Sequence, residues 1–422
     1  MKNYKVSING KIKVNFEVII KKLYEVSKIN ENGEVLVSAF EAEEITWVIL
    51  PCLKFNFEIS EHNISSLCWE VLKEIVRKKL FTENDFLKIF NEKIKIKYKN
   101  KLKEFHLLAS LTIDYLPIRK VTISNCEIKI VGKKFPKKYI QSRNKHYTQD
   151  VFNDKDYLKL IIITKDLNAY DAFERMEKIL NVLKALISFE VNYTLGIHSG
   201  PFNRINKVVF GNLFTMHHPN GTSNNDNSYW FNQNLKLKVL KVRDSHKERF
   251  KLNLKYSLKK INKCQPKHQN TIFNALNIYT KAFDEENPYS CYLQAWTALE
   301  VLNETDSNDV LIKRFSMLYY YENERKYQKQ ILESLRGYRN NIVHNGNNNL
   351  VPFVLSYQCQ KYLMNLLFLY HFPLAGKITS VDYVNRILDQ KSKSIKDLKK
   401  ELEINKKVIA MKLKHEKNHP NS

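Results

Sequence analysis

The clearest pattern in this chain of 422 residues is a series of helical periods between residues 268 and 371. In each segment the apolar residues recur three or four positions apart, which places them on one face of an α-helix. Only short polar loops separate the segments, and such connections favour antiparallel packing of successive helices. The pattern therefore predicts an all-α antiparallel bundle. Its helices are expected over His268–Asp284, Tyr289–Asn303, Asp309–Tyr321, Glu324–Asn345 and Leu350–His371.

The region before this bundle, residues 1–262, mixes two periodicities. Ile64–Lys79 and Ala169–Phe189 have helical spacing, and the second of them follows an apolar run, Leu158–Thr164, typical of a buried strand. Alternation of polar and apolar residues indicates further strands. They are expected over Lys11–Phe16, Glu34–Ala39, Lys93–Lys103, Phe105–Leu116, Lys120–Val131 and Asn206–Phe214.

The predicted fold class is therefore α+β. A strand-rich, mixed N-terminal region of residues 1–262, with a sub-boundary near residue 150, precedes the helical bundle at residues 263–375. Around the long helix at Ala169–Phe189 the order strand, helix, strand indicates a β-α-β arrangement. The boundary near 262 falls inside a densely basic stretch, Leu235–Lys263, which begins like a strand and ends like a connector.

Residues 376–422 form a third region with the spacing of a helical arm. Seven of ten positions in an a/d-like register are apolar, which favours packing against a bundle or in a coiled coil. The other faces are rich in Lys, so a partly frayed basic tail is the alternative. The ten positions are Val381, Val384, Leu388, Lys391, Ile395, Leu398, Leu402, Asn405, Ile409 and Lys412.

The net charge of +25 indicates a polyanionic partner, either nucleic acid or an anionic membrane surface. Most of the excess is Lys, and it accompanies abundant Asn, Ile and Tyr, a composition that an A/T-rich coding genome also produces. Lys93–Lys103 and Leu235–Lys263 concentrate this charge. Each has two interpretations, a surface that follows a phosphate backbone or a solvated strand face or linker.

The six cysteines lie far apart and form no CxxC pair, which indicates reduced, buried thiols of an intracellular protein. The N-terminus lacks the apolar core of a signal peptide, and no run approaches the roughly 18 apolar residues of a membrane span. We therefore expect a cytoplasmic protein without a membrane partner. His217 and His218 are adjacent in a polar loop, without a third ligand at a recognisable spacing, so no metal or cofactor is predicted.

One predicted helix carries polar groups of three kinds near its C-terminal end. In ILESLRGYRNNIVHNG (Ile331–Gly346), Arg336, Asn340 and His344 lie at i, i+4 and i+8, with Arg339 one residue aside. A guanidinium, a carboxamide and an imidazole together can bind a phosphate and move its protons. The apolar stripe on the same helix is expected to face the core, and Asn345-Gly346 to end the helix. That stripe consists of Ile331, Leu335, Tyr338 and Ile342.

The same residues also have a purely structural explanation. Arg and His near a helix C-terminus complement the helix dipole whatever their function. With twelve Arg and twelve His in the chain, about one such pair is expected by chance. The spacing alone therefore leaves the function open.

The bundle resembles the HEPN superfamily, whose motif is an Arg, a polar residue, three further residues and a His. In this chain the motif corresponds to Arg339, Asn340, residues 341–343 and His344. YSCYLQAWTALEVLNE (Tyr289–Glu304) and LRGYRNNIVHNG (Leu335–Gly346) resemble in particular the group called Apea-like HEPN. In that group an aromatic residue and a Leu-Glu pair on an early helix accompany the Arg-His helix. The resemblance covers about residues 268–372, and residues 150–240 resemble more loosely a region that often precedes such bundles.

This resemblance implies two functions. Many HEPN proteins are metal-independent endoribonucleases, often toxins or antiviral defence effectors, in which two copies of the motif form one site across a homodimer. Others are inactive and bind nucleotides or form dimers. The chain is accordingly predicted to cleave RNA in a dimeric site under the control of an unknown trigger or regulatory protein. The alternative is a non-catalytic module that binds nucleotide or RNA and dimerises.

The residue types suit RNA cleavage without a metal, which needs a base, an acid and a positive group at phosphorus. His344 fits either proton role, and Arg339 offers a charged fork to the non-bridging oxygens. Asn340 is expected to orient His344 or to bind the phosphate. Glu300 is expected to hold an imidazole tautomer or to position Arg339, with an ordinary surface carboxylate as the alternative, and Arg336 is a supporting residue. One imidazole cannot conveniently be both acid and base, which favours a dimer.

Overall fold

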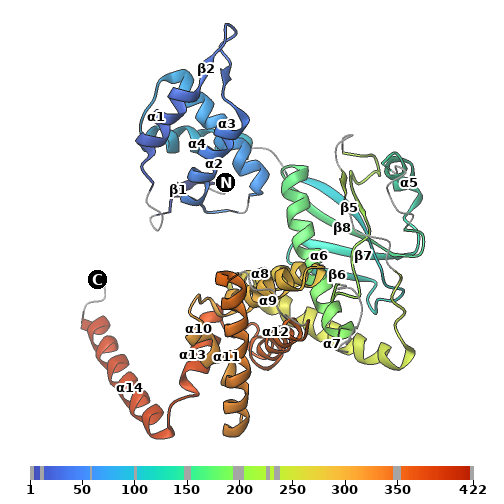
Figure 1. Cartoon of the computed structure of the whole chain (residues 1–422), viewed down its shortest axis with the longest axis vertical. Coiled ribbons are helices and arrows are strands. Elements are labelled where there is room, and N and C mark those ends of the chain that lie inside the picture. The colour runs from blue at the N-terminus through green and yellow to red at the C-terminus, as the bar shows by residue number, and fades with distance from the viewer. Residues whose placement is uncertain are drawn as a thin grey trace.

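A computed structural model shows that the protein combines α-helices with antiparallel β-sheet. Figure 1 shows how these helices and strands are arranged. The α+β class predicted from the sequence is confirmed. The structure describes residues 4–9, 14–57, 59–98, 102–146, 154–192, 204–224, 229–231, 238–345 and 353–418.

The N-terminal unit, residues 4–98, has a hydrophobic core of its own. Each of its four α-helices begins after a side chain that accepts backbone N–H groups of the first turn: Asn15, Ser38, Ser60 or Thr82. The third helix confirms the one predicted over Ile64–Lys79. The elements are β1 (Val6–Ile8), α1 (Phe16–Val26), β2 (Lys28–Ile29), β3 (Val35–Leu36), α2 (Ala39–Ile49), β4 (Leu53–Phe55), α3 (Glu61–Lys78) and α4 (Glu83–Lys97).

The basic strand predicted over Lys93–Lys103 is wrong for its first half, because residues 93–97 are the last turns of α4. Phe86, Phe90 and Ile94 follow one another at four-residue intervals along this helix, and all three are fully buried. This longer helical spacing outweighs the short Lys-Ile alternation, which by itself does not distinguish a strand from a helix end.

Two other predicted strands of this unit also change. Glu34–Ala39 is reduced to β3, because Ser38 caps α2 and turns the chain into that helix. In Lys11–Phe16, residues 11–13 lie outside the described residues, and Phe16 is the first residue of α1.

A six-stranded antiparallel sheet begins the second unit. Its strands are β5 (Lys103–Leu111), β6 (Lys120–Ile123), β7 (Cys126–Gly132), β8 (Leu158–Asp166), β9 (Leu213–His217) and β10 (Tyr229–Phe231). The order across the sheet is β10-β9-β5-β8-β7-β6. Because β8 and β9 both pair antiparallel with β5, they run parallel to each other with β5 between them. The long helix α6 (Ala169–Val191) connects them, which is the predicted strand, helix, strand order.

Two predicted strands of the sheet have different bounds. Lys120–Val131 is a hairpin and not one strand, because Ser124 adopts a left-handed conformation with φ of 51° in the turn between β6 and β7. Asn206–Phe214 becomes a strand only at Leu213, and before that Phe210 makes a single isolated bridge to Leu111.

The two faces of the sheet are covered by different helices. Leu107 and Leu160 point to one face and share a core with α6, whereas their neighbours Leu108 and Ile161 point to the other. There they pack with Tyr139 of the short helix α5 (Lys137–Asn144). The strands are therefore buried on both faces, as the apolar run at residues 158–164 indicates.

From residue 244 on, the described part of the chain is mainly helical, and the helices predicted between residues 268 and 371 are confirmed. Residues 244–263 of the basic stretch Leu235–Lys263 also form a helix, where a connector was expected, and residues 235–237 lie outside the described part. The helices are α7 (Asp244–Lys263), α8 (Pro266–Asp284), α9 (Pro288–Asn303), α10 (Asn308–Ser316), α11 (Glu322–Asn345), α12 (Phe353–Leu366) with a π-helical turn (Leu367–His371), α13 (Val381–Gln390) and α14 (Ile395–Asn418).

One hydrophobic core continues from the sheet into these helices and extends from Phe105 to Leu388. Helix α6 lies between the sheet and α8, and Thr280 of α8 donates its hydroxyl to the carbonyl of Asn181 in α6 at 2.9 Å. The predicted boundary near residue 262 thus falls at the end of α7, inside this core. The one near residue 150 falls among residues 147–153, outside the described part.

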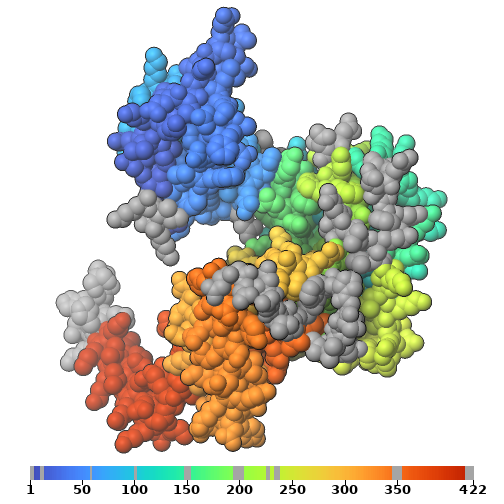
Figure 2. Space-filling model, viewed as in Figure 1, coloured from blue at the N-terminus to red at the C-terminus, as the bar shows by residue number. Residues whose placement is uncertain are grey.

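The predicted C-terminal arm consists of two helices with different environments. Val381, Val384 and Leu388 of α13 are buried in the core, whereas in α14 Ile395 is 73% and Ile409 57% exposed and Leu398 is partly exposed. Ser394 separates the two helices by capping α14, its Oγ accepting the N–H of Asp397 at 3.1 Å. In Figures 1 and 2, α14 projects from the edge of the molecule.

Candidate functional site

Helix α11 is held on its inner side by the core. Leu332 and Leu335 are fully buried, and the hydroxyl of Tyr292 in α9 donates to the carbonyl of Leu335 at 2.5 Å. Ile331 and Ile342 pack partly against the same core. Tyr338, which was predicted to face the core, is instead 40% exposed, and Leu332 takes the place in the buried stripe.

The outer side of the same helix presents the predicted motif. Arg339 and Asn340 are partly exposed, and Nη1 of Arg339 donates to Oδ1 of Asn340 at 3.4 Å. His344 is exposed one turn further along. Asn340 was expected to orient His344 or to bind phosphate. Its hydrogen bond with Arg339 orients the Asn340 carboxamide toward that guanidinium. Gly346, which was expected to end the helix, lies outside the described residues.

Glu300 of α9 is a partly buried carboxylate next to this motif. The indole N–H of Trp296, one turn earlier, donates to its Oε1 at 2.9 Å. Burial raises the pKa of the Glu300 carboxyl, and the hydrogen bond from Trp296 and the positive charge of Arg339 oppose that shift. Glu300 therefore interacts electrostatically with Arg339 from a neighbouring helix.

Arg336, the supporting residue, has acidic partners. Its Nη1 lies 2.7 Å from Oδ1 of Asp309 in α10, and its Nη2 lies 2.5 Å from Oε2 of Glu333. The pair with Asp309 ties α11 to α10, the pair with Glu333 lies within α11, and together they neutralise the guanidinium locally. Arg336 therefore fits a role in holding the helix better than a role in contacting substrate.

The two histidines of the polar loop are in different positions. His217 ends β9 and is fully buried, with hydrogen bonds to Thr215, Ser142 and the carbonyl of Gly221, and burial lowers its pKa to about 4. His218 is partly exposed beside it. No cluster of three or more His, Cys, Asp or Glu side chains with metal-binding geometry occurs among the described residues.

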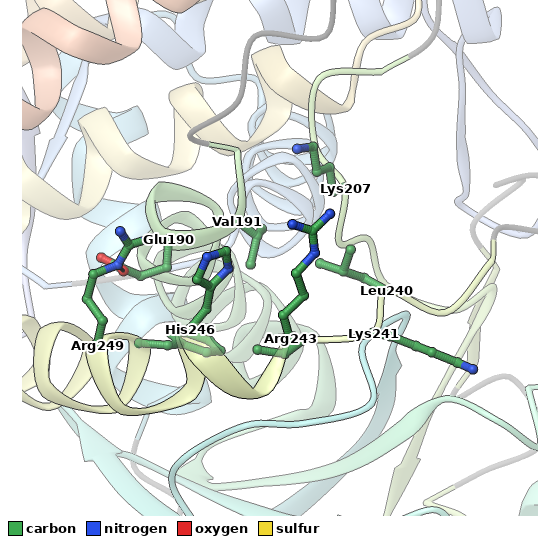
Figure 3. Close-up of a pocket in the computed structure, with 10 residues that line it drawn as sticks. Glu190, Val191, Lys207, Leu240, Lys241, Arg243, His246 and Arg249 are labelled. Atoms are coloured by element: carbon green, nitrogen blue, oxygen red, sulfur yellow. Dashed lines mark ion pairs between the residues drawn. The ribbon is translucent and has the colours of Figure 1, made fainter.

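A second polar site, which the sequence analysis did not identify, is a basic pocket between α6 and α7 (Figure 3). Lys207, Arg243, His246 and Arg249 line it together with the carboxylate of Glu190. The basic density of Leu235–Lys263 was the available signal. It did not show that α7 begins at Asp244 or that Lys207, more than thirty residues earlier, contributes to the same pocket.

Comparison of the chain with known protein families, with curated proteins and with solved structures finds no match. The resemblance to HEPN proteins therefore rests on the quoted residues alone. Within the described part of the chain, no helix combines the length and the apolarity that a membrane crossing requires.

Proposed function

We propose that this chain is a metal-independent endoribonuclease of the HEPN type that acts in the cytoplasm as a toxin or an antiviral defence effector. One observation carries the proposal. The end of α11 offers a guanidinium, a carboxamide and an imidazole to the surface, and a carboxylate on α9 acts on that guanidinium. The net charge of +25 further supports a polyanionic substrate.

The reaction would use the ribose itself as the nucleophile. A base removes the proton of the 2′-hydroxyl, the 2′-oxygen attacks phosphorus, and the bond from phosphorus to the 5′-oxygen breaks as an acid protonates that oxygen. The products are a 2′,3′-cyclic phosphate and a 5′-hydroxyl. His344 serves in one proton transfer. Arg339 stabilises the charge on the non-bridging oxygens, and Asn340 holds the guanidinium on one side.

A second copy of the chain would complete the site. One imidazole holds one proton, so a single His344 cannot conveniently begin the reaction as base and also as acid. His344 is exposed in the single chain, which leaves it accessible to His344 of a second copy. In the dimer, one imidazole begins neutral and takes the proton of the 2′-hydroxyl, and the other begins protonated and gives its proton to the 5′-oxygen. The site therefore neither gains nor loses a proton in one turnover.

The test compares the wild-type protein with Arg339→Ala and His344→Ala on total RNA in EDTA. Arg386→Ala is the matched control, because Arg386 is an exposed guanidinium on α13 that is paired with Asp382. We expect discrete cleavage products from the wild type and the control, and a loss of at least roughly 100-fold in rate for either site variant. Light scattering should show dimers in all four samples.

Cleavage is also expected to depend on a trigger that purified protein lacks. The same four proteins are therefore also assayed in cells during phage infection. RNA cleavage in infected cells that requires Arg339 and His344 supports the proposal. Equal RNA profiles for the wild type and His344→Ala under both conditions contradict it. In that case, RNA binding without cleavage would support the non-catalytic binding and dimerisation module.

A further inference from the structure

The pocket of Figure 3 is a cavity of about 180 Å³ between the end of α6 and the beginning of α7. Glu190 and Val191 come from the last turn of α6, and Lys207 comes from the segment before β9. The remaining wall is residues 240–243 and the first turns of α7. None of the residues that line it belongs to α9 or α11, so the site is separate from the Arg339 motif.

The spacing on α7 explains why basic groups face this cavity. Arg243, His246 and Phe250 lie at i, i+3 and i+7, and therefore on one side of the helix. Phe250 is only 2% exposed because it packs into the core, so this side of α7 faces the body of the protein. In Figure 3 the side chains of Arg243 and His246 rise from α7 into the space below Lys207, whereas Lys241 points away.

The segment before α7 is fixed by hydrogen bonds to the end of β5. Leu240 donates its N–H to the carbonyl of Thr112 at 2.9 Å and accepts the N–H of Asp114 at 3.1 Å. The N–H of Val242 donates to Oδ1 of Asp114 at 3.0 Å. The position of Arg243 is therefore set by the sheet, and the pocket is already formed without a ligand.

Positive charge exceeds negative charge in this lining. Lys207, Arg243 and Arg249 oppose one carboxylate, Glu190, which gives a net charge of +2 from 3 − 1 without counting His246 or Lys241. Glu190 is itself held in place, since Nδ2 of Asn253 lies 3.0 and 3.1 Å from its two oxygens. Burial lowers the pKa of Lys207, because partial desolvation disfavours the charged ammonium.

We propose that this pocket binds the phosphate groups of a nucleotide. Phosphate matches the forked donors of Arg243 and the ammonium of Lys207, and the pocket lies at the start of the 20-residue helix α7, where the helix dipole favours an anion. Val191, Leu240 and Phe250 give the cavity an apolar side, which suits a base or sugar. A small, concave cavity favours such a ligand over an extended nucleic-acid strand. The proposal does not depend on ribonuclease activity.

The test is calorimetric titration of the full-length protein with ATP, ADP and inorganic phosphate. Arg243→Gln and Lys207→Gln each remove one charge from the pocket, and Lys255→Gln removes one from the exposed part of α7 as a matched control. We expect binding of ATP by the wild type and by Lys255→Gln, and affinity about tenfold weaker in each pocket variant. Circular dichroism establishes that all variants are folded, and Arg243→Lys should recover part of the affinity.

Three results would overturn the proposal. The first is no heat of binding with any of the three ligands. The second is equal affinity of Arg243→Gln and the wild type. The third is binding of a short single-stranded RNA, but not of ATP, that depends on Arg243, which would assign the pocket to a nucleic-acid strand. Because RNA cleavage is measured separately with Arg339 and His344 variants, failure here is distinguishable from failure of the proposed ribonuclease.

Discussion

Glu300 has surroundings that differ from those of an ordinary surface carboxylate. A surface carboxylate would be solvated, but Glu300 is partly buried, accepts a hydrogen bond from Trp296 and feels the charge of Arg339. The indole fixes the direction of the carboxylate, and the carboxylate in turn attracts the guanidinium.

His217 predicts a pH dependence of stability at the residue scale. The carbonyl of Gly221 accepts from its Nδ1, so its Nε2 accepts from the hydroxyl of Thr215, which receives a hydrogen bond from Arg143. A proton added to Nε2 would point at the hydroxyl of Thr215, which is already a donor to this nitrogen. Protonation of the ring is therefore unfavourable, and burial lowers the pKa of His217 to about 4. Above about pH 6.5 folded and unfolded states both hold the neutral ring; below it only the unfolded state gains a proton.

We therefore expect His217 to contribute a loss of about 1.4 kcal/mol of unfolding free energy per pH unit as the pH falls from 6.5 toward 4.5. Urea unfolding at several pH values measures this slope. In His217→Gln the slope should be shallower by that amount, whatever the absolute stability of the variant. His62→Gln, which removes an exposed histidine from α3, is the control. Identical slopes for wild type and His217→Gln would contradict the assignment.

At the scale of elements, long apolar periods were predictable and short ones were not. Four of the five helices observed over this range, α8, α9, α11 and α12, have 14 or more residues, so one odd residue such as Tyr338 does not change the result. The Lys-Ile alternation near residue 95 spans too few residues to distinguish a strand from the end of α4. The motif on α11 was readable because it lies within one helix. The basic pocket was not, because Lys207 and Arg243 meet only through the packing of α6 and α7.

The arm provides a prediction about elements, because α13 and α14 continue one sequence pattern but differ in burial. Removing residues 395–422 deletes a helix whose side chains are mostly exposed over residues 395–413, and should change the free energy of unfolding by less than about 0.5 kcal/mol. Leu388→Ala in α13 instead opens a cavity in the core and should cost about 2–5 kcal/mol. Urea unfolding of both variants makes the comparison. A large loss of stability on truncation would mean that α14 packs against a surface in solution.

At the scale of the whole molecule, a polar contact joins the two largest hydrophobic cores, that of the N-terminal unit and that of the sheet and the following helices. Figure 2 shows the N-terminal unit, in blue, beside the rest of the molecule. Asp171 in α6 is buried at this contact. Its Oδ1 accepts the backbone N–H of Ser60 at 2.9 Å and the amide of Asn63 at 2.7 Å, and its Oδ2 accepts the hydroxyl of Tyr98 at 3.4 Å. One carboxylate thus fixes the start of α3 and the end of the N-terminal unit against the sheet unit.

Asp171→Ala should therefore weaken the contact between the N-terminal unit and the sheet unit while leaving the hydrophobic core of each unit intact. The substitution removes the acceptor of four donors, since Nδ2 of Asn168 also donates to Oδ2 at 2.7 Å, and each donor left unsatisfied costs about 1–3 kcal/mol where water does not replace the carboxylate. We expect limited proteolysis to cut Asp171→Ala between the two units, near residue 100, sooner than the wild type. Asp171→Asn should behave in between, since its amide retains one acceptor oxygen. Asp382→Ala, which breaks an exposed ion pair on α13, is the control. Wild-type cleavage kinetics in Asp171→Ala would show that apolar packing between the units, and not this carboxylate, holds them together.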